Sequence, residues 1–306
     1  MTRRDMLLAA LVASLWGLNF VVIDWGMSGI PPLLFVAIRF AVVALAAVVV
    51  PRPATGWRVV VGVGLFMSLG QFALLYSALA LGLSPGLAAL LLQAQAVFTI
   101  VLAAAALRER PSVPQAVGVT LGVVGLAIVA VFRGGDAPVV AVCFALAAAL
   151  SWAVGNVISR RAGVVTGVGR GGTLSLTVWS SLVVPVPAVA LSLVVDGPAA
   201  ITAGLAAIGP AAVVSTVYTA GLCTLFGYAV FNGLLGRNPS AAVVPWILLA
   251  PVVAMASAAV LLGETPSVGE VVGGAVLVAG VLVTGIRRRA QTARPVSKGA
   301  PIRLSA

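Results

Sequence analysis

Ten long apolar runs constrain this chain more than any other feature, because each is about as long as a membrane-spanning helix. Only 8% of the 306 residues are charged, whereas soluble domains carry roughly 25%. We therefore predict an all-α integral membrane protein of ten transmembrane helices. Bounded by charges, Pro and Gly, these helices are predicted at 6–26, 32–50, 58–80, 85–107, 114–132, 138–159, 171–194, 208–235, 239–262 and 268–286.

The basic residues are distributed unevenly over the predicted loops. Sixteen lie in the segments on the side of the N-terminus, and only Arg133 lies in the loops on the other side. Because Lys and Arg are retained in the cytoplasm, we predict a multi-pass plasma (inner) membrane protein with both termini cytoplasmic. The net charge of +11 is thus explained by topology. No nucleic-acid partner is expected, since no basic face with interleaved aromatic residues occurs.

The second half of the sequence repeats the first. Pro85, Gly118 and Gly125 align with Pro239, Gly273 and Gly280, and Trp16 and Asn19 correspond to Trp152 and Asn156. We predict one repeat at 1–133 (helices 1 to 5), a second at 134–286 (helices 6 to 10) and a basic cytoplasmic tail at 287–306. Five helices is an odd number, so the two copies must be inverted. Inverted repeats are typical of secondary transporters, in which the substrate site lies near the bilayer midplane.

Several kinds of chemistry are excluded by the residues that are missing. The chain has no His, and its two cysteines, Cys143 and Cys223, are far from any Cys-x-x-Cys spacing. We expect no metal site, no cofactor and no catalytic residues. A membrane-embedded enzyme is the alternative from another class, but the sequence has neither His nor paired intramembrane carboxylates to support it.

Longer motifs resemble one known family. They are "WGLNFVVI" at 16–23, "PPL" at 31–33, "LLQAQAVFTI" at 91–100, "SWAVGN" at 151–156 and "LLAPVV" at 248–253. With these motifs, the chain up to about residue 290 resembles the EamA family of the drug/metabolite transporter superfamily. The resemblance implies gradient-driven export of small amino-acid-like metabolites of the O-acetylserine and cysteine type. Export of drugs, purines or other metabolites is the alternative within that family.

Polar and aromatic residues inside the apolar runs are the candidates for substrate binding. Trp16 and Asn19 share one helix face, as do Trp152, Asn156 and Ser159. An Asn amide both donates and accepts hydrogen bonds, which suits a zwitterionic substrate; equally, it could hold the repeats together. The remaining candidates are Gln71, Gln93, Gln95, Tyr228, Asn232 and Trp246. Gln93 and Gln95 point in different directions on a helix, so one of them is expected to be structural.

Two further features concern partners. Asp24 and Arg39 lie inside predicted spans, where charge is costly, and we predict that they form an ion pair that is structural or proton-linked. Gly118 and Gly122, like Gly269 and Gly273, form Gly-x-x-x-Gly motifs, which bring helices together within a chain or between protomers. The expected partners are thus a small-molecule substrate, the lipid bilayer and, as an alternative, a second copy in a homodimer.

Overall fold

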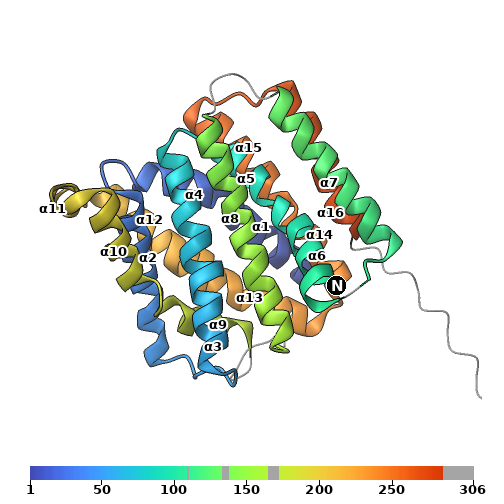
Figure 1. The fold of residues 1–306 in the computed structure, drawn as a ribbon, viewed down its shortest axis with the longest axis horizontal. Helices are drawn as coiled ribbons and strands as arrows, with labels where there is room; N and C mark the ends of the chain where they lie inside the picture. The colour runs from blue at the N-terminus through green and yellow to red at the C-terminus, as the bar shows by residue number, and fades with distance from the viewer. Residues whose placement is uncertain (109, 133–137, 165–171, 285–306) are drawn as a thin grey trace, which may run out of the picture.

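The computed structural model describes residues 1–108, 110–132, 138–164 and 172–284. The tail predicted at 287–306 lies outside the described residues. Every regular element in the described ranges is a helix, and the helices pack side by side as a bundle (Figure 1). The prediction of an all-helical protein is therefore confirmed.

The elements of the first half follow the predicted runs closely. They are α1 (Arg3–Gly26), α2 (Pro32–Leu45), η1 (Ala46–Val48), α3 (Trp57–Val63), η2 (Gly64–Gly70), α4 (Gln71–Ala80), α5 (Pro85–Leu92), α6 (Ala94–Leu107) and α7 (Val113–Phe132). The elements of the second half are α8 (Val139–Arg161), α9 (Thr173–Ser181), α10 (Pro185–Val195), α11 (Gly197–Ala206), α12 (Pro210–Val217), η3 (Tyr218–Phe226), α13 (Gly227–Arg237), α14 (Ser240–Ile247), α15 (Leu249–Leu262) and α16 (Val268–Thr284).

Local sequence explains where these helices start and stop. The Thr2 hydroxyl accepts a hydrogen bond from the Asp5 amide at the start of α1, as an N-cap does. Pro32 and Pro85 occupy the first positions of α2 and α5, where a missing N–H costs nothing. Helix α15 is capped at its C-terminal end by Gly263, whose φ of 72° is left-handed and suits glycine.

Not all of the ten predicted spans meet the length and apolarity that a membrane-crossing helix needs. Within the described ranges, seven helices are long and apolar enough to cross a membrane, and the bent pair α9 and α10 would make eight. The spans predicted at 32–50 and 268–286 are the apolar helices Pro32–Val48 and Val268–Thr284, which have at most 17 residues and are shorter than the usual span of about 20. The total of ten helices thus stays a prediction.

One predicted span is not a continuous helix in the structure. The span expected at 171–194 is broken into α9 and α10, which bend by 43°. Pro185 begins α10, and its ring and missing N–H prevent one continuous helix. The loop expected after residue 194 instead contains a short apolar helix, α11, which starts at Gly197 with a φ of 82°.

The same irregularities occur in both halves. The long helices Trp57–Ala80 and Pro210–Arg237 each contain a π-helical segment, η2 and η3 respectively. A second irregularity also recurs, because α5 and α6 are interrupted at Gln93, and α14 and α15 at Leu248. Pro245 precedes only the second interruption. Because π-helical turns are often found at functional sites, these two segments indicate that the middle of the bundle is a candidate functional site.

Helices α7 and α16 lie side by side through glycines that the repeat aligns (Figure 1). A Cβ added to Gly125 would lie 2.6 Å from the carbonyl oxygen of Gly273, and one added to Gly280 would lie 2.7 Å from that of Gly118. The two contacts run in opposite sequence directions, so the helices are antiparallel. Each contact also maps onto the other when the aligned glycines are exchanged. This is the pattern that two inverted repeats would produce between α7 and α16.

The first helix of each half packs mainly against the opposite half. Helix α1 contacts α12, η3, α13, α14 and α15, whereas α8 contacts α3, η2, α4, α5 and α6. Helix α1 is held by hydrogen bonds from Ser215 to the carbonyl of Val22 and from Tyr218 to the carbonyl of Leu15, at 2.7 Å and 2.9 Å. The two halves are therefore interlocked, and each half contains a helix that completes the other.

Candidate functional site

A cavity of about 290 Å³ lies between the two halves. Its inner end is formed in the middle of the bundle by Phe40 of α2, Phe72 of α4 and Thr224 of η3. Its other end is formed by Arg160 at the end of α8 and Thr173 at the start of α9. The cavity therefore connects the middle of the protein to the side on which α8 ends.

The lining of this cavity combines aromatic rings with hydroxyl groups. Trp152 and Tyr228 contribute rings, and Ser159, Thr177 and Ser180 are among the hydroxyl side chains. Arg160 is the one charged residue among the described lining residues. Such a surface offers hydrogen-bond donors and acceptors together with apolar faces, which is how pockets for small polar molecules are built.

Three of the predicted substrate residues line the cavity: Trp152, Asn156 and Tyr228. The Asn156 amide donates a hydrogen bond to the Thr99 hydroxyl at 3.3 Å, and Thr99 also lines the cavity. Ser159 lies on the same face of α8, as its helical spacing from Asn156 predicts. The polar face predicted for this helix therefore does line a cavity.

Trp16, the counterpart of Trp152 in the first half, lies elsewhere. Its indole Nε1 donates a hydrogen bond to the carbonyl oxygen of Cys223 at 2.9 Å. Its ring packs against those of Tyr228 and Phe231, with ring centroids 5.2 and 5.4 Å apart. It is not among the lining residues. Trp16 therefore connects α1 to η3 and α13. It could affect a substrate in the cavity only through Tyr228, against which its ring packs.

Three of the predicted amides are buried side chains outside the cavity lining: Asn19, Gln71 and Asn232. One amide atom of each, namely Asn19 Oδ1, Gln71 Oε1 and Asn232 Nδ2, is buried and has no hydrogen-bond partner among the described residues. Most buried polar groups in proteins have a hydrogen-bond partner. These three atoms without one are therefore unusual, and they lie in the interior close to the helices that line the cavity.

The last three predicted residues also lie away from the cavity lining. Gln93 stands at the interruption between α5 and α6, and Gln95 lies in the first turn of α6. Trp246 of α14 packs against a small apolar cluster that includes Ala9, Leu234 and Val243. These positions favour a structural role for Trp246.

The predicted ion pair between Asp24 and Arg39 is wrong. Arg39 donates from Nη1 to the Tyr76 hydroxyl at 2.9 Å and from Nη2 to the Thr224 hydroxyl at 3.1 Å. Asp24 instead lies in the last turn of α1 and lines a hollow with Met27 and other residues of the α1–α2 turn. Arg39 fails to reach it because its side chain points into the bundle toward α4 and η3.

Several lining residues were missed from the sequence. Thr224 lies one helical turn before Tyr228, so it could have been found by extending the polar face of that helix. Phe40 and Phe72 gave no such signal, because an aromatic side chain in an apolar run looks the same whether it faces lipid, core or cavity. Arg160 was interpreted only as a sign of topology.

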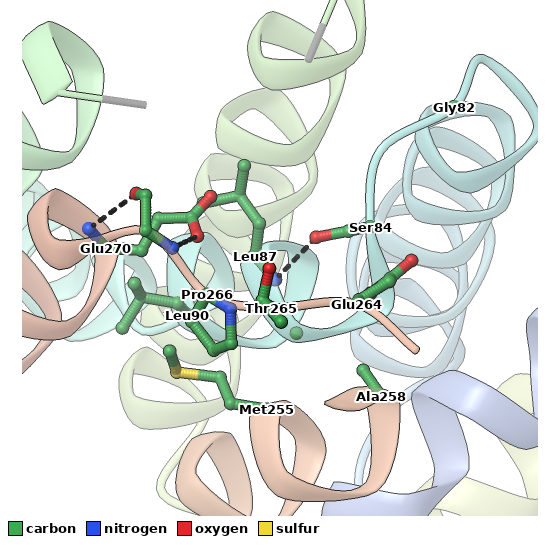
Figure 2. Close-up of a pocket in the computed structure, with 12 residues that line it drawn as sticks. Gly82, Ser84, Leu87, Leu90, Met255, Ala258, Glu264, Thr265, Pro266 and Glu270 are labelled. Carbon is green, nitrogen blue, oxygen red and sulfur yellow. Dashed lines mark hydrogen bonds between the residues drawn. The ribbon is translucent and has the colours of Figure 1, made fainter. Parts of the chain in front are cut away.

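A second hollow lies on the opposite side of the molecule, where α5 begins and α15 ends (Figure 2). It is lined by Glu264 and Glu270. The Glu270 carboxylate accepts from the Ser267 amide at 2.8 Å, which caps α16. Desolvation, followed by the charges of Asp24 and Glu270, raises the pKa of the Glu264 carboxyl above its usual value. This acidic hollow shares no lining residue with the central cavity.

The sequence "GLSPG" at 82–86 in this hollow has the Gly-x-Ser-x-Gly spacing of hydrolase nucleophiles. In the structure the Ser84 hydroxyl accepts a hydrogen bond from the Leu87 amide and caps α5 (Figure 2). With no His in the chain to activate it, Ser84 has a structural role.

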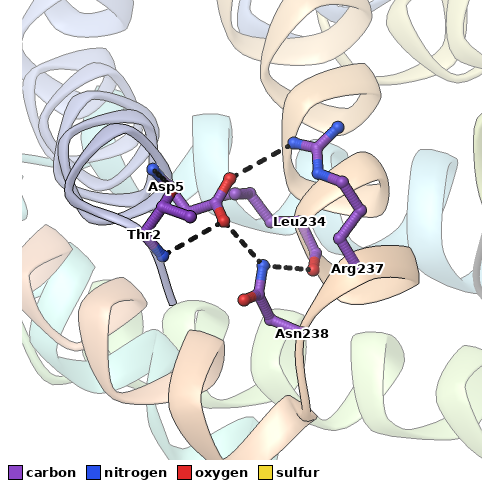
Figure 3. Close-up of polar contacts among 5 residues, drawn as sticks. All are labelled: Thr2, Asp5, Leu234, Arg237 and Asn238. Atoms are coloured by element: carbon purple, nitrogen blue, oxygen red, sulfur yellow. Dashed lines mark hydrogen bonds and ion pairs between the residues drawn. The ribbon is translucent and has the colours of Figure 1, made fainter.

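An ion pair joins the start of α1 to the end of α13 (Figure 3). Asp5 lies 3.5 Å from the Arg237 guanidinium and accepts a hydrogen bond from the Asn238 amide at 3.2 Å. The Arg237 side chain is 60% exposed, so water screens the pair and its contribution to stability is small. It positions the first helix on the second half at the end of the bundle where the chain starts.

Comparison with known proteins gives two matches to one family. Residues 4–131 and residues 139–286 each match the EamA-like transporter family. A protein of Salmonella typhimurium named "Probable amino-acid metabolite efflux pump" is 40% identical over 299 residues, covering 96% of this chain and 99% of the relative. A protein of Escherichia coli K12 with the same name is 37% identical over 294 residues, covering 94% and 98%.

The fold is also found among solved structures. One crystal structure superposes with a TM-score of 0.61 and covers 92% of this chain and 96% of the other. The two sequences are 20% identical, so the likeness concerns the fold alone.

Proposed function

This chain belongs to the EamA-like transporter family, and from that premise we propose that it exports small amino-acid-like metabolites. Family membership makes it a multi-pass membrane transporter and not an enzyme. O-acetylserine and cysteine are the substrates that we propose first. The names of the two bacterial relatives support an amino-acid metabolite as cargo.

The central cavity is the observation that carries this proposal. Its volume of about 290 Å³ suits a solute of a few heavy atoms, and Trp152, Asn156 and Tyr228 provide an amide and two aromatic faces. An aromatic face attracts an ammonium group, and the amide can bond either charged end of an amino acid. The proposed substrate site is therefore the inner end of this cavity.

The proposed mechanism is alternating access between two inverted repeats at 1–133 and 134–286. The described cavity reaches the side of Arg160 and ends at Phe40, Phe72 and Thr224 in the middle of the bundle. By the positive-inside rule that side is the cytoplasm, from which an exporter loads its cargo. Rocking of the interlocked halves would then close this side and open the other. The reciprocal glycine contacts of α7 and α16 support the two-fold relation that such exchange needs.

Transport into inverted membrane vesicles tests the proposal. Labelled O-acetylserine and cysteine should accumulate in vesicles that contain the protein, saturably, and more strongly when a proton gradient is imposed. Uptake of a drug or purine with no uptake of either labelled solute would contradict the amino-acid assignment. The family membership would then stand without that substrate. Uptake that neither saturates nor responds to a gradient would indicate a passive channel.

A further inference from the structure

Arg39 is a buried cation whose partners are all neutral. Its side chain is 3% exposed, and both of its described hydrogen bonds go to hydroxyl groups, those of Tyr76 and Thr224. The centre of its guanidinium lies 4.1 Å from the centroid of the Phe72 ring and 5.4 Å from that of Phe40. Its Nε has no hydrogen-bond partner among the described residues.

This arrangement leaves a charge uncompensated in the middle of a membrane protein. Hydroxyl groups and ring faces solvate a guanidinium partly, but they do not neutralise it, and buried cations are usually paired with an anion. Among the described residues, no carboxylate forms an ion pair with Arg39. The ion pair found there joins Asp5 and Arg237. Charged residues retained inside membrane-spanning helices generally serve the transported species.

The groups around Arg39 are also the inner wall of the central cavity. Phe40, Phe72 and Thr224 contact the guanidinium and line the cavity. The Thr224 hydroxyl, which lines the cavity, is 3.1 Å from Nη2. The cation therefore lies directly behind the deepest part of the site, one side-chain layer from the space that a solute would occupy.

We propose that Arg39 binds the carboxylate of the transported solute. This inference rests on the proposed function, and it adds that the cargo must carry a carboxylate. The carboxylate enters beside Thr224 as the Phe72 ring turns aside, and it accepts hydrogen bonds from Nη2 and Nε. Arg is suited to this role because its planar donors match the two oxygens of a carboxylate. The ammonium end of an amino acid then faces Trp152 and Tyr228.

Acid and ester forms of the same solute test this assignment on the wild-type protein. The purified protein is heated with O-acetylserine or its methyl ester, and with cysteine or its methyl ester, and the midpoint of unfolding is followed. We expect the acids to raise the midpoint at concentrations about tenfold to a hundredfold below those needed for the esters, the ratio expected for hydrogen bonds to a charged group. Equal shifts by acid and ester would overturn the role of Arg39 alone. No shift by any of the four would overturn the proposed function and this inference together.

Variants then assign the preference to one side chain. Arg39→Gln should abolish the acid-over-ester ratio, and Arg39→Lys should keep part of it, because a point charge remains without the planar donors. The matched control is Arg52→Gln, since Arg52 packs on Trp57 outside the cavity lining. It should keep the wild-type ratio. Where Arg39→Gln does not fold, Arg39→Lys decides: an unchanged ratio and an unchanged KM for uptake would refute the assignment.

Discussion

Trp16 donates a hydrogen bond from its indole Nε1 to the main-chain oxygen of Cys223, 2.9 Å away in the opposite half of the chain. The other half contains a similar contact, in which the Ser151 hydroxyl donates to the main-chain oxygen of Phe66 at 2.8 Å. Both oxygens belong to π-helical segments, where regular helical bonding is altered. The first helix of each half thus supplies a donor to an irregular turn of the other half.

Replacing Trp16 tests whether this hydrogen bond stabilises the fold. Trp16→Phe keeps a ring beside Tyr228 but removes the donor, and we expect it to lower stability by about 0.5–1.5 kcal/mol. The midpoint of thermal unfolding in detergent measures the change. Trp246→Phe is the matched control, because Trp246 packs against an apolar cluster and should lose less. An equal loss in both variants would show that the lost ring volume, and not the bond, matters.

Gly125→Ala tests the contact between α7 and α16. The added methyl would lie 2.6 Å from the Gly273 oxygen, so the helices must separate, and overpacking of this kind costs about 1–3 kcal/mol. The loss is measured as a lower unfolding midpoint in detergent. Gly236→Ala is the control, because a Cβ there meets nothing within 4 Å, and it should not lower stability.

Uptake by two amide variants tests which predicted residues contact substrate. Asn156 lines the cavity and Gln93 does not. We expect Asn156→Ala to raise the KM for uptake about tenfold, the effect of losing one hydrogen bond to a charged group, and Gln93→Ala to stay near the wild-type value. The reverse order would move the substrate site from the cavity to the interruption of helix α5.

Cysteine labelling tests which side of the membrane the cavity faces. With Cys143 and Cys223 replaced by Ser, Thr173→Cys at the mouth of the cavity should react with a membrane-impermeant maleimide only in inverted vesicles. Thr265→Cys in the acidic hollow should react only in intact cells. Labelling of both from the same side would contradict the positive-inside orientation.

Stability should fall as the pH rises because of Glu264. The pKa of this carboxyl is raised from its ordinary value of 4.5 by desolvation and by the nearby charges of Asp24 and Glu270. Below pH 4.5 the group is neutral in both the folded and the unfolded protein. Between pH 4.5 and the raised pKa the carboxyl is ionised in the unfolded chain but still protonated in the folded protein, so the free energy of unfolding decreases as the pH rises through this window. Glu264→Gln should flatten this part of the pH profile of the unfolding midpoint; an unchanged slope would count against the electrostatic cause.

Much of this architecture is predictable from the sequence because lipid imposes few choices. Apolar run length fixes where helices such as Pro85–Leu107 begin and end, since backbone groups in hydrocarbon must bond within the helix. The polar face of α8 was predictable for the same reason, because Asn156 and Ser159 are costly in lipid and turn toward a cavity. The similarity between the two halves of the sequence also aligned Gly125 with Gly280.

The features that could not be predicted depend on packing between helices. Asp24 and Arg39 were paired because each was the other's nearest opposite charge along the sequence, but the Arg39 side chain turns toward Tyr76 and Thr224. Gly118, Gly125 and their counterparts meet within one chain, which removes the observation that suggested a homodimer. The homodimer itself stays a prediction. Phe40 and Phe72 line the cavity, but an aromatic residue in an apolar run gives no sign in the sequence of whether it faces lipid, core or cavity.

The interlocked first helices have a consequence for how the protein is made. Helix α1 leaves the ribosome and enters the bilayer long before α12, α13 and α15 have been synthesised, yet those are the helices that it packs against. Until they arrive, the polar groups of α1 such as Asn19 must be tolerated in lipid or shielded by the insertion machinery. A first half made alone would therefore leave the surface of α1 that packs on α12, α13 and α15 without its neighbours.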